Sequence, residues 1–167
     1  IGLQYPFGKN ARLDSLIKAT AKPVITDQIG QCRKILASGN TDTALSMAGR
    51  IERNIAIYGL GSDTLLFTKF RELKKNIADA LCHKAQEVYT DFMNQAGKAV
   101  SQEQYIASDT LYYKAIKVTE DFPECHIDPN EAINGKKAFL LGCNYQKMMN
   151  NASSALLQYN YNSYFYL

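Results

Sequence analysis

The chain has 167 residues, of which 46% are hydrophobic and 21% are charged, and its formal net charge is +3. This composition excludes a disordered chain, since disordered chains carry too little apolar surface to form a core. The basic residues are interspersed with acidic ones rather than gathered in the basic stripe typical of nucleic-acid binders, and no apolar run is long enough to cross a bilayer. We therefore expect neither a nucleic-acid partner nor a transmembrane segment.

The first part of the chain predicts a lead-in followed by helices. Residues 1–10 are rich in Gly and Pro and predict an irregular segment, whereas 11–167 predicts a single helical domain. Apolar residues at helical spacing predict helices over 11–20 and 24–38, which we separate because Pro23 suits the first turn of a new helix. The chain begins with Ile rather than Met, so we expect a mature form or a piece of a longer protein, and its compartment is left open.

Glycines frame the next two predicted helices. Gly39 ends the preceding helix, and the pattern then predicts a helix over 42–58 that ends at Gly59. The following apolar positions keep spacings of three or four residues as far as Gly97. They predict one long helix over 63–97, or two helices with a kink between them.

The sequence after Gly97 predicts three helices. Ser101 is a typical N-cap and Pro123 a typical stop, so the stretch between them predicts a helix over 101–121. An Asp-Pro start signal precedes a helix over 129–149, and an Asn pair separates it from a last helix over 152–165. No alternating pattern predicts strands, so the expected fold class is all-α.

The apolar stripes of these helices predict the core. Ten positions are expected to be buried: Ala44, Ala48, Ile51, Ile77, Leu81, Val88, Phe92, Leu111, Ala115 and Leu141.

Several of these helices resemble tetratricopeptide repeats, in which small and aromatic residues recur at fixed positions of two antiparallel helices. Three units carry the resemblance. The first is the turn at Gly39 with Ala44, Ala48 and Ile51, and the second is Ser108, Tyr112 and Ala115, ending at Pro123. The third is Leu141-Gly142 with Tyr145, followed by Ala155 and Tyr159. No constant repeat period connects the three units. The resemblance implies stacked α-hairpins that form an α-α superhelix and bind a protein or peptide.

The cysteines and histidines are the residues most able to carry chemistry. Cys82-His83 and Cys125-His126 supply the four side chains of a possible zinc site, but adjacent helix residues point about 100° apart and chelate one ion poorly. We expect no metal, no cofactor and no catalytic residues. The four scattered cysteines favour free thiols in the core, with a single disulfide left open.

The expected function is a non-catalytic scaffold for protein or peptide interaction. Tyr105, Tyr113, Lys114 and Tyr145 are the expected peptide-binding residues, because an aromatic ring beside a cation is a plausible docking surface for a carboxylate. Two alternatives stay open. One is a ligand-binding or enzymatic domain with a site between helices, and the other is a structural domain of a larger envelope or secreted protein. The partner's identity and the oligomeric state are left open.

Overall fold

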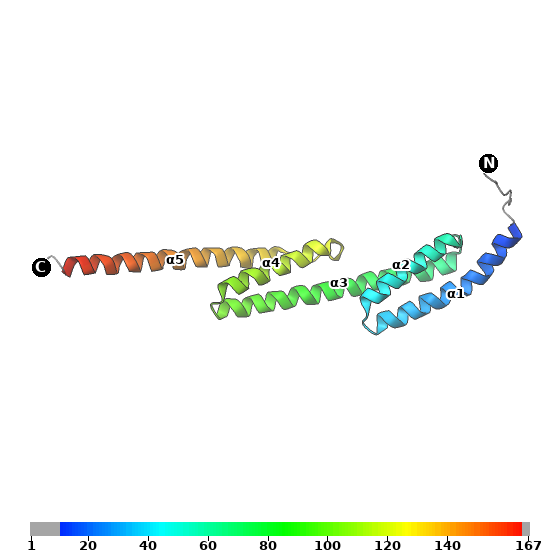
Figure 1. Ribbon diagram of the computed structural model, residues 1–167, viewed down its shortest axis with the longest axis horizontal. Coiled ribbons are helices and arrows are strands. Elements are labelled where there is room, and N and C mark those ends of the chain that lie inside the picture. The colour runs from blue at the N-terminus through cyan, green and yellow to red at the C-terminus, as the bar shows by residue number, and fades with distance from the viewer. Residues whose placement is uncertain (1–10, 165–167) are drawn as a thin grey trace, which may run out of the picture. The chain divides into compact units, whose positions relative to one another are not determined.

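The computed structural model describes residues 11–164 and confirms an all-α fold, with no strand in that range (Figure 1). The elements are α1 (Ala11–Ala37), α2 (Thr41–Ile57), α3 (Thr64–Ser101), α4 (Tyr105–Asp121), the short 3-10 turn η1 (Pro123–Cys125) and α5 (Asn130–Tyr164). The expected lead-in over residues 1–10 lies outside the described residues.

Two predicted helix breaks are wrong. Pro23 lies inside α1, and α5 continues through Asn150 and Asn151. The apolar stripe of α1 stays in register across Pro23, since Ala21 and Ile25 are both buried, and this packing outweighs the lost hydrogen bond. Neither asparagine has the positive φ that would end a helix, because the positive-φ non-glycine residues of the described chain are found elsewhere.

The helix ends in the first half follow local side-chain chemistry. Gly39 and Gly59 have φ values of 82° and 60° and provide the turns after α1 and α2, as predicted. Asn40 caps α2 by accepting a hydrogen bond from the Thr43 N–H at 3.2 Å. Asp63 caps α3 by accepting one from the Leu66 N–H.

The start of α4 differs from the prediction. Ser101 is the last residue of α3 rather than a cap for α4, and its hydroxyl donates to the Lys98 carbonyl at 2.7 Å. α4 starts after Gln104, which makes no side-chain capping bond. The long helix therefore passes through Gly97, where a single glycine costs only about 1 kcal/mol relative to alanine.

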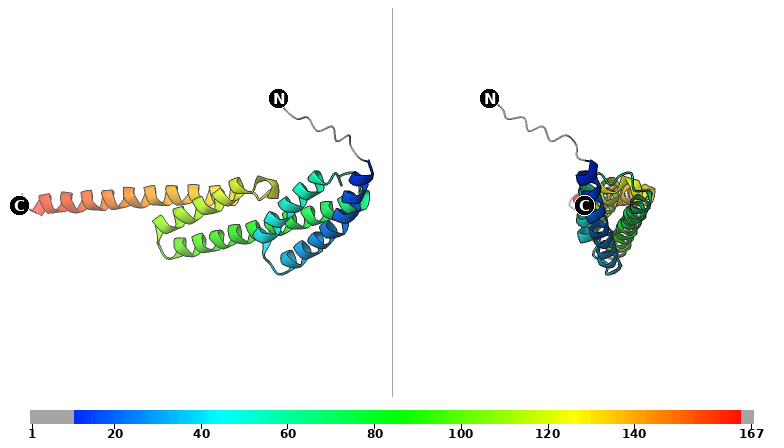
Figure 2. Two further views of the ribbon diagram at one scale, coloured as in Figure 1. Left: turned by 45° about the vertical axis from the view of Figure 1, so that its right-hand side comes forward. Right: turned by 90° about the vertical axis from the view of Figure 1, so that its right-hand side faces the viewer.

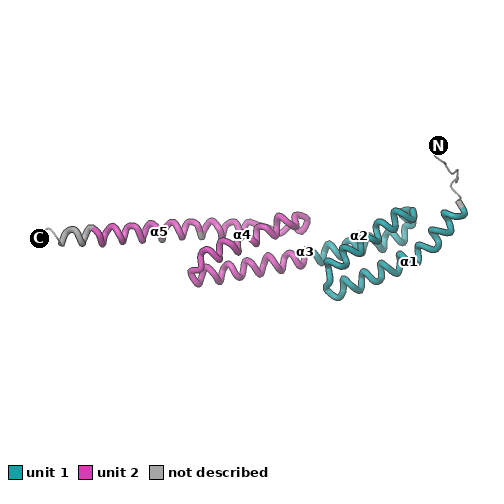
Figure 3. Tube along the Cα trace, in the orientation of Figure 1, with its two compact units in different colours: residues 1–81 teal, residues 82–167 magenta. Residues whose placement is uncertain are grey.

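The chain forms two compact units, residues 1–81 (unit 1) and 82–167 (unit 2), which share helix α3 (Figure 3). Unit 1 packs α1, α2 and the first part of α3 around aliphatic side chains. Its most buried large residues include Ile25, Ile51, Leu66 and Leu73. The predicted core residues Ala44 and Ala48 are buried in α2, and Cys32 donates a hydrogen bond to the Ala44 carbonyl at 3.2 Å.

Unit 2 packs the rest of α3 with α4 and α5 around a smaller core. Its buried members are Tyr89, Ala96, Tyr112, Ala115 and Ala132. Partly buried side chains, Phe92 and Leu111 among them, pack against this core.

Two expected core residues are exposed, which corrects the prediction. Val88 is 39% exposed and Leu141 is 72% exposed. Tyr89, the neighbour of Val88, takes the inward position on α3, and the two side chains point about 100° apart. Leu141 lies on a face of α5 that no described helix covers.

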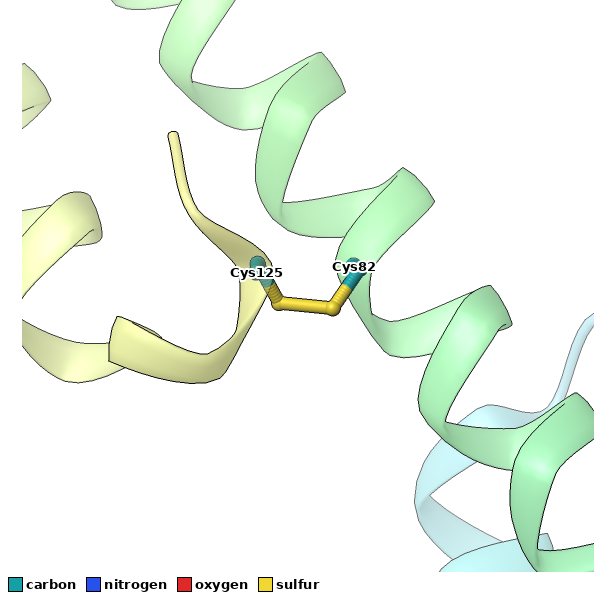
Figure 4. Close-up of a disulfide and its surroundings, with 2 residues drawn as sticks. All are labelled: Cys82 and Cys125. Carbon is teal, nitrogen blue, oxygen red and sulfur yellow. A yellow bond between two sulfur atoms is a disulfide. The ribbon is translucent and has the colours of Figure 1, made fainter. Parts of the chain in front are cut away.

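A disulfide joins Cys82 on α3 to Cys125 in η1, with their Cα atoms 5.1 Å apart (Figure 4). The prediction of free thiols is therefore wrong for this pair, whereas Cys32 and Cys143 are free. Tyr89 holds the same loop by donating a hydrogen bond to the Asp128 carbonyl at 3.1 Å. Burial and nearby carboxylates raise the pKa of Tyr89, which keeps its hydroxyl protonated as a donor.

Candidate interaction surface

The predicted peptide-binding residues all lie in unit 2, but they do not form one cluster. Tyr105 and Tyr113 lie on α4 and are 39% and 57% exposed, while Tyr145 lies on α5 and is 66% exposed. The Lys114 ammonium lies 5.7 Å from the centre of the Phe92 ring on α3. The structure therefore turns Lys114 toward α3 and does not place it beside Tyr113.

A different cation lies against Tyr113. The Lys136 ammonium of α5 is 5.4 Å from the centre of the Tyr113 ring and 3.6 Å from the Asp109 carboxylate. Sequence reasoning missed Lys136 because it comes from another helix, and no local spacing connects it with Tyr113. The Asp109 carboxylate already offsets its charge, so this arrangement joins α4 to α5 and offers little to an incoming carboxylate.

Close packing between α4 and α5 is confined to the first half of α5. A Cβ atom added to Gly135 would lie 2.5 Å from Tyr112 Cε1, so the tyrosine ring rests directly on the glycine. Ser108, Ala115 and Ala132 are completely buried in the same region. Small residues let two helices approach closely, and here they bring the buried Tyr112 into contact with α5.

The second half of α5 has no such neighbour. α4 has 17 residues and α5 has 35, so α4 covers only the start of α5. Figures 1 and 2 both show α5 continuing past the turn that joins α3 to α4.

A row of apolar side chains, here named the α5 stripe, lies on this uncovered half. It consists of Leu141, Tyr145, Met148, Ala152 and Leu156. Spacings of three and four residues place them on one helix face. The four large members are 66–72% exposed. This row of exposed apolar side chains is the candidate interaction surface, since large exposed apolar patches are uncommon on monomeric proteins.

The part of α5 that carries the last three residues of the stripe is uncharged. From Met148 to the end of α5 there is no Asp, Glu, Lys, Arg or His. This half of the helix therefore offers no cation to a phosphate and no carboxylate to a metal. Its polar side chains are amides and hydroxyls, which hydrogen-bond at the rim of an apolar contact.

Among the described residues, no group of three His, Cys, Asp or Glu side chains is placed so that it could hold a metal ion. His83 is 3.5 Å from Glu87, but both side chains are largely exposed in an open cleft. The cysteines of both Cys-His pairs are joined to each other, so neither supplies a thiolate.

No helix in the described part of the chain combines the length and apolarity that a membrane span requires. No protein-family model, curated protein or solved structure matches this chain. The functional argument therefore rests on the geometry and chemistry of the surfaces themselves.

Proposed function

We propose that this protein is a non-catalytic helical scaffold that binds a helical segment of a partner protein along the α5 stripe. The observation that carries the proposal is the row of four large apolar side chains, each at least 66% exposed, on the uncovered half of α5. Burying one such side chain contributes about 1.5–3 kcal/mol, so a partner that covers the row gains a substantial free energy.

The chemistry of the stripe favours a helix with an apolar, uncharged face. Leu141, Tyr145, Met148 and Ala152 follow one another at spacings of four, three and four residues, the pattern with which one helix packs into the grooves of another. Anionic lipid surfaces and nucleic acids attract basic side chains, and this half of α5 has none after Lys147.

The tetratricopeptide-like character of the chain is part of the proposal. Small residues are completely or almost completely buried on the middle helix of each unit, Ala44 and Ala48 of α2 in unit 1 and Ser108 and Ala115 of α4 in unit 2. This supports hairpins related to those of helical-repeat scaffolds, which present helix faces to protein ligands. The third predicted hairpin has no counterpart, because its two halves belong to the single helix α5.

The test compares two faces of α5. A photo-crosslinking amino acid at Tyr145 should capture a partner, while the same group at Ser154, about 180° away around the helix, should not. The partner is then identified and its affinity for the purified chain is measured. Met148→Asp should abolish binding, whereas Lys147→Asp on another face should retain it. A Met148→Asp variant that keeps its helical circular dichroism and wild-type affinity would show that the stripe is not the site.

The expected surface on α4 is tested in the same assay. Tyr113→Ala removes the ring that carries Lys136, and Lys114→Glu reverses the charge that lies against Phe92. If the partner binds only along α5, both variants should keep its affinity. A loss of binding with either variant would extend the contact onto α4.

A further inference from the structure

A second surface lies in unit 1, where a groove runs along α1 and α2. Two neighbouring clefts of about 440 Å³ each lie between these helices and share Gln28 and Asn54 as lining residues. The Asn54 amide donates a hydrogen bond to the Gln28 side-chain oxygen at 3.3 Å. The two clefts therefore form one groove, with this amide pair at its middle.

One half of the groove is apolar. Ile17 and Val24 of α1 line it together with Tyr58, the residue directly after α2, and these side chains are 39%, 57% and 39% exposed. Buried Ala21 and Ile25 form its floor. This half offers contact area to apolar side chains of a ligand.

The other half carries two guanidinium groups. Arg50 and Arg53 line it above the buried side chains of Met47 and Ile51. The two arginines are three residues apart on α2, so they project from the same side of the helix. No carboxylate belongs to the lining of either half.

Neither arginine has an ion-pair partner among the described residues. The carboxylates that form ion pairs in unit 1 are engaged elsewhere, with Asp63 bound to Lys22, Glu72 to Arg33 and Glu52 to Lys74. Arg50 and Arg53 therefore remain available to carboxylates from outside. Guanidinium groups match the planar geometry of carboxylates and bind them with two parallel hydrogen bonds.

We propose that the α1–α2 groove is a docking site for an acidic amphipathic helix of a partner protein. The apolar residues of that helix lie in the half formed by Val24 and Tyr58, and its carboxylates lie against Arg50 and Arg53. The groove extends along α1 from Ile17 to Gln31, which at 1.5 Å per residue is about 20 Å, or about four turns of a bound helix.

Charge complementarity with Arg50 and Arg53 favours an acidic helix as the ligand of the α1–α2 groove. A nucleic acid would require a longer run of cations and no apolar half. The groove lies in unit 1 and the α5 stripe in unit 2, so this proposal does not depend on the proposed function. The two surfaces differ in chemistry, since one carries unpaired arginines and the other carries no charge.

The experiment uses the full chain and two synthetic peptides. One is an alanine-based helix of about five turns with leucines at helical spacing in its first half and three glutamates near its end, and the other replaces the glutamates with glutamine. The acidic peptide should bind about tenfold more tightly in a fluorescence anisotropy titration, because two partly exposed ion pairs contribute roughly 0.7 kcal/mol each. The difference should shrink as salt is raised.

Variants locate the binding. The double variant Arg50→Gln, Arg53→Gln should remove the preference for the acidic peptide, while Lys34→Gln, Lys75→Gln removes the same number of charges from unit 1 outside the groove and should retain it. Val24→Glu should weaken the binding of both peptides. The proposal is overturned if the acidic peptide does not bind, if both peptides bind equally to the wild-type chain, or if the double arginine variant, still helical by circular dichroism, keeps the preference.

Discussion

Unit 1 and unit 2 are both built from three antiparallel helical segments, but they are stabilised differently. In unit 1 large aliphatic side chains fill the core, and Ile51 and Leu73 are completely buried. In unit 2 three of the five buried residues of the core are alanines, and the Cys82–Cys125 disulfide ties the α4–α5 loop to α3. The difference shows how a crosslink supplements a core that buries less apolar surface.

The same difference explains why the two proposed docking surfaces lie in different kinds of place. In unit 1 the helices cover one another, and the available surface is a groove between two of them. In unit 2 α5 is about twice as long as α4, so its second half is left with an apolar face that nothing described covers. Four experiments test this comparison.

Loss of the disulfide should have the largest effect, and it should be confined to unit 2. The crosslink closes a loop of 43 residues, for which the chain-entropy relation gives about 4 kcal/mol. In a Cys82→Ser, Cys125→Ser variant, hydrogen exchange should show lost protection in α4 and the start of α5, with α1 and α2 unchanged. Cys143→Ser is the control and should leave all helices protected. Equal loss in both units would show that they unfold together.

Truncation of a core residue in unit 1 should be the next largest effect. Ile51→Ala removes a completely buried side chain and should lower the free energy of unfolding by about 2–5 kcal/mol in urea titrations. Leu141→Ala, which removes a 72% exposed side chain from unit 2, should change it by less than about 0.5 kcal/mol. A large effect of Leu141→Ala on the isolated chain would mean that the α5 stripe is covered within the molecule or by a second copy.

A pair of glycine substitutions tests the close packing of α4 on α5. Gly135→Ala forces a methyl group against Tyr112 and should destabilise unit 2 by about 1–3 kcal/mol, less the helix propensity that alanine adds. Gly142→Ala, further along α5, meets nothing within 4 Å and should stabilise by up to about 1 kcal/mol. Opposite signs in thermal melts support the geometry, whereas stabilisation by both would contradict it.

The smallest effect should be the change in stability with pH that comes from Asp63, at the start of α3 in unit 1. The Lys22 ammonium and the Leu66 N–H hold the pKa of Asp63 below its ordinary value of 3.8. A carboxylate with a lowered pKa in the folded state stabilises the protein above the unfolded pKa, and this contribution is lost as pH falls through the folded pKa.

Asp63→Asn keeps a capping side chain but loses the ion pair with Lys22. The difference in urea midpoint between wild type and this variant should be constant at neutral pH and should shrink below pH 3.8. A difference that persists unchanged into strong acid would show that the ion pair is not its source.

The candidate surfaces were only partly predictable from the sequence. Exposed Tyr113 and Tyr145 were expected at a surface, and both are exposed. Tyr145 belongs to the α5 stripe, whereas its neighbour Leu141 in the stripe is predicted as core, because an apolar face at helical spacing has the same pattern whether or not another helix covers it. The arginines of the α1–α2 groove gave no signal in the sequence, since a groove requires two helices in register.

The sequence by itself determined the helical class and most helix ends, because both depend on residues close together in the chain. Helical spacing, the glycines at 39 and 59, and Asp63 at a cap act within one or two turns. Only the tertiary structure decided that Cys82 meets Cys125, that Lys136 rather than Lys114 lies on Tyr113, and that Leu141 is exposed. These features depend on which helices become neighbours, a choice made by packing across the whole unit rather than by local spacing.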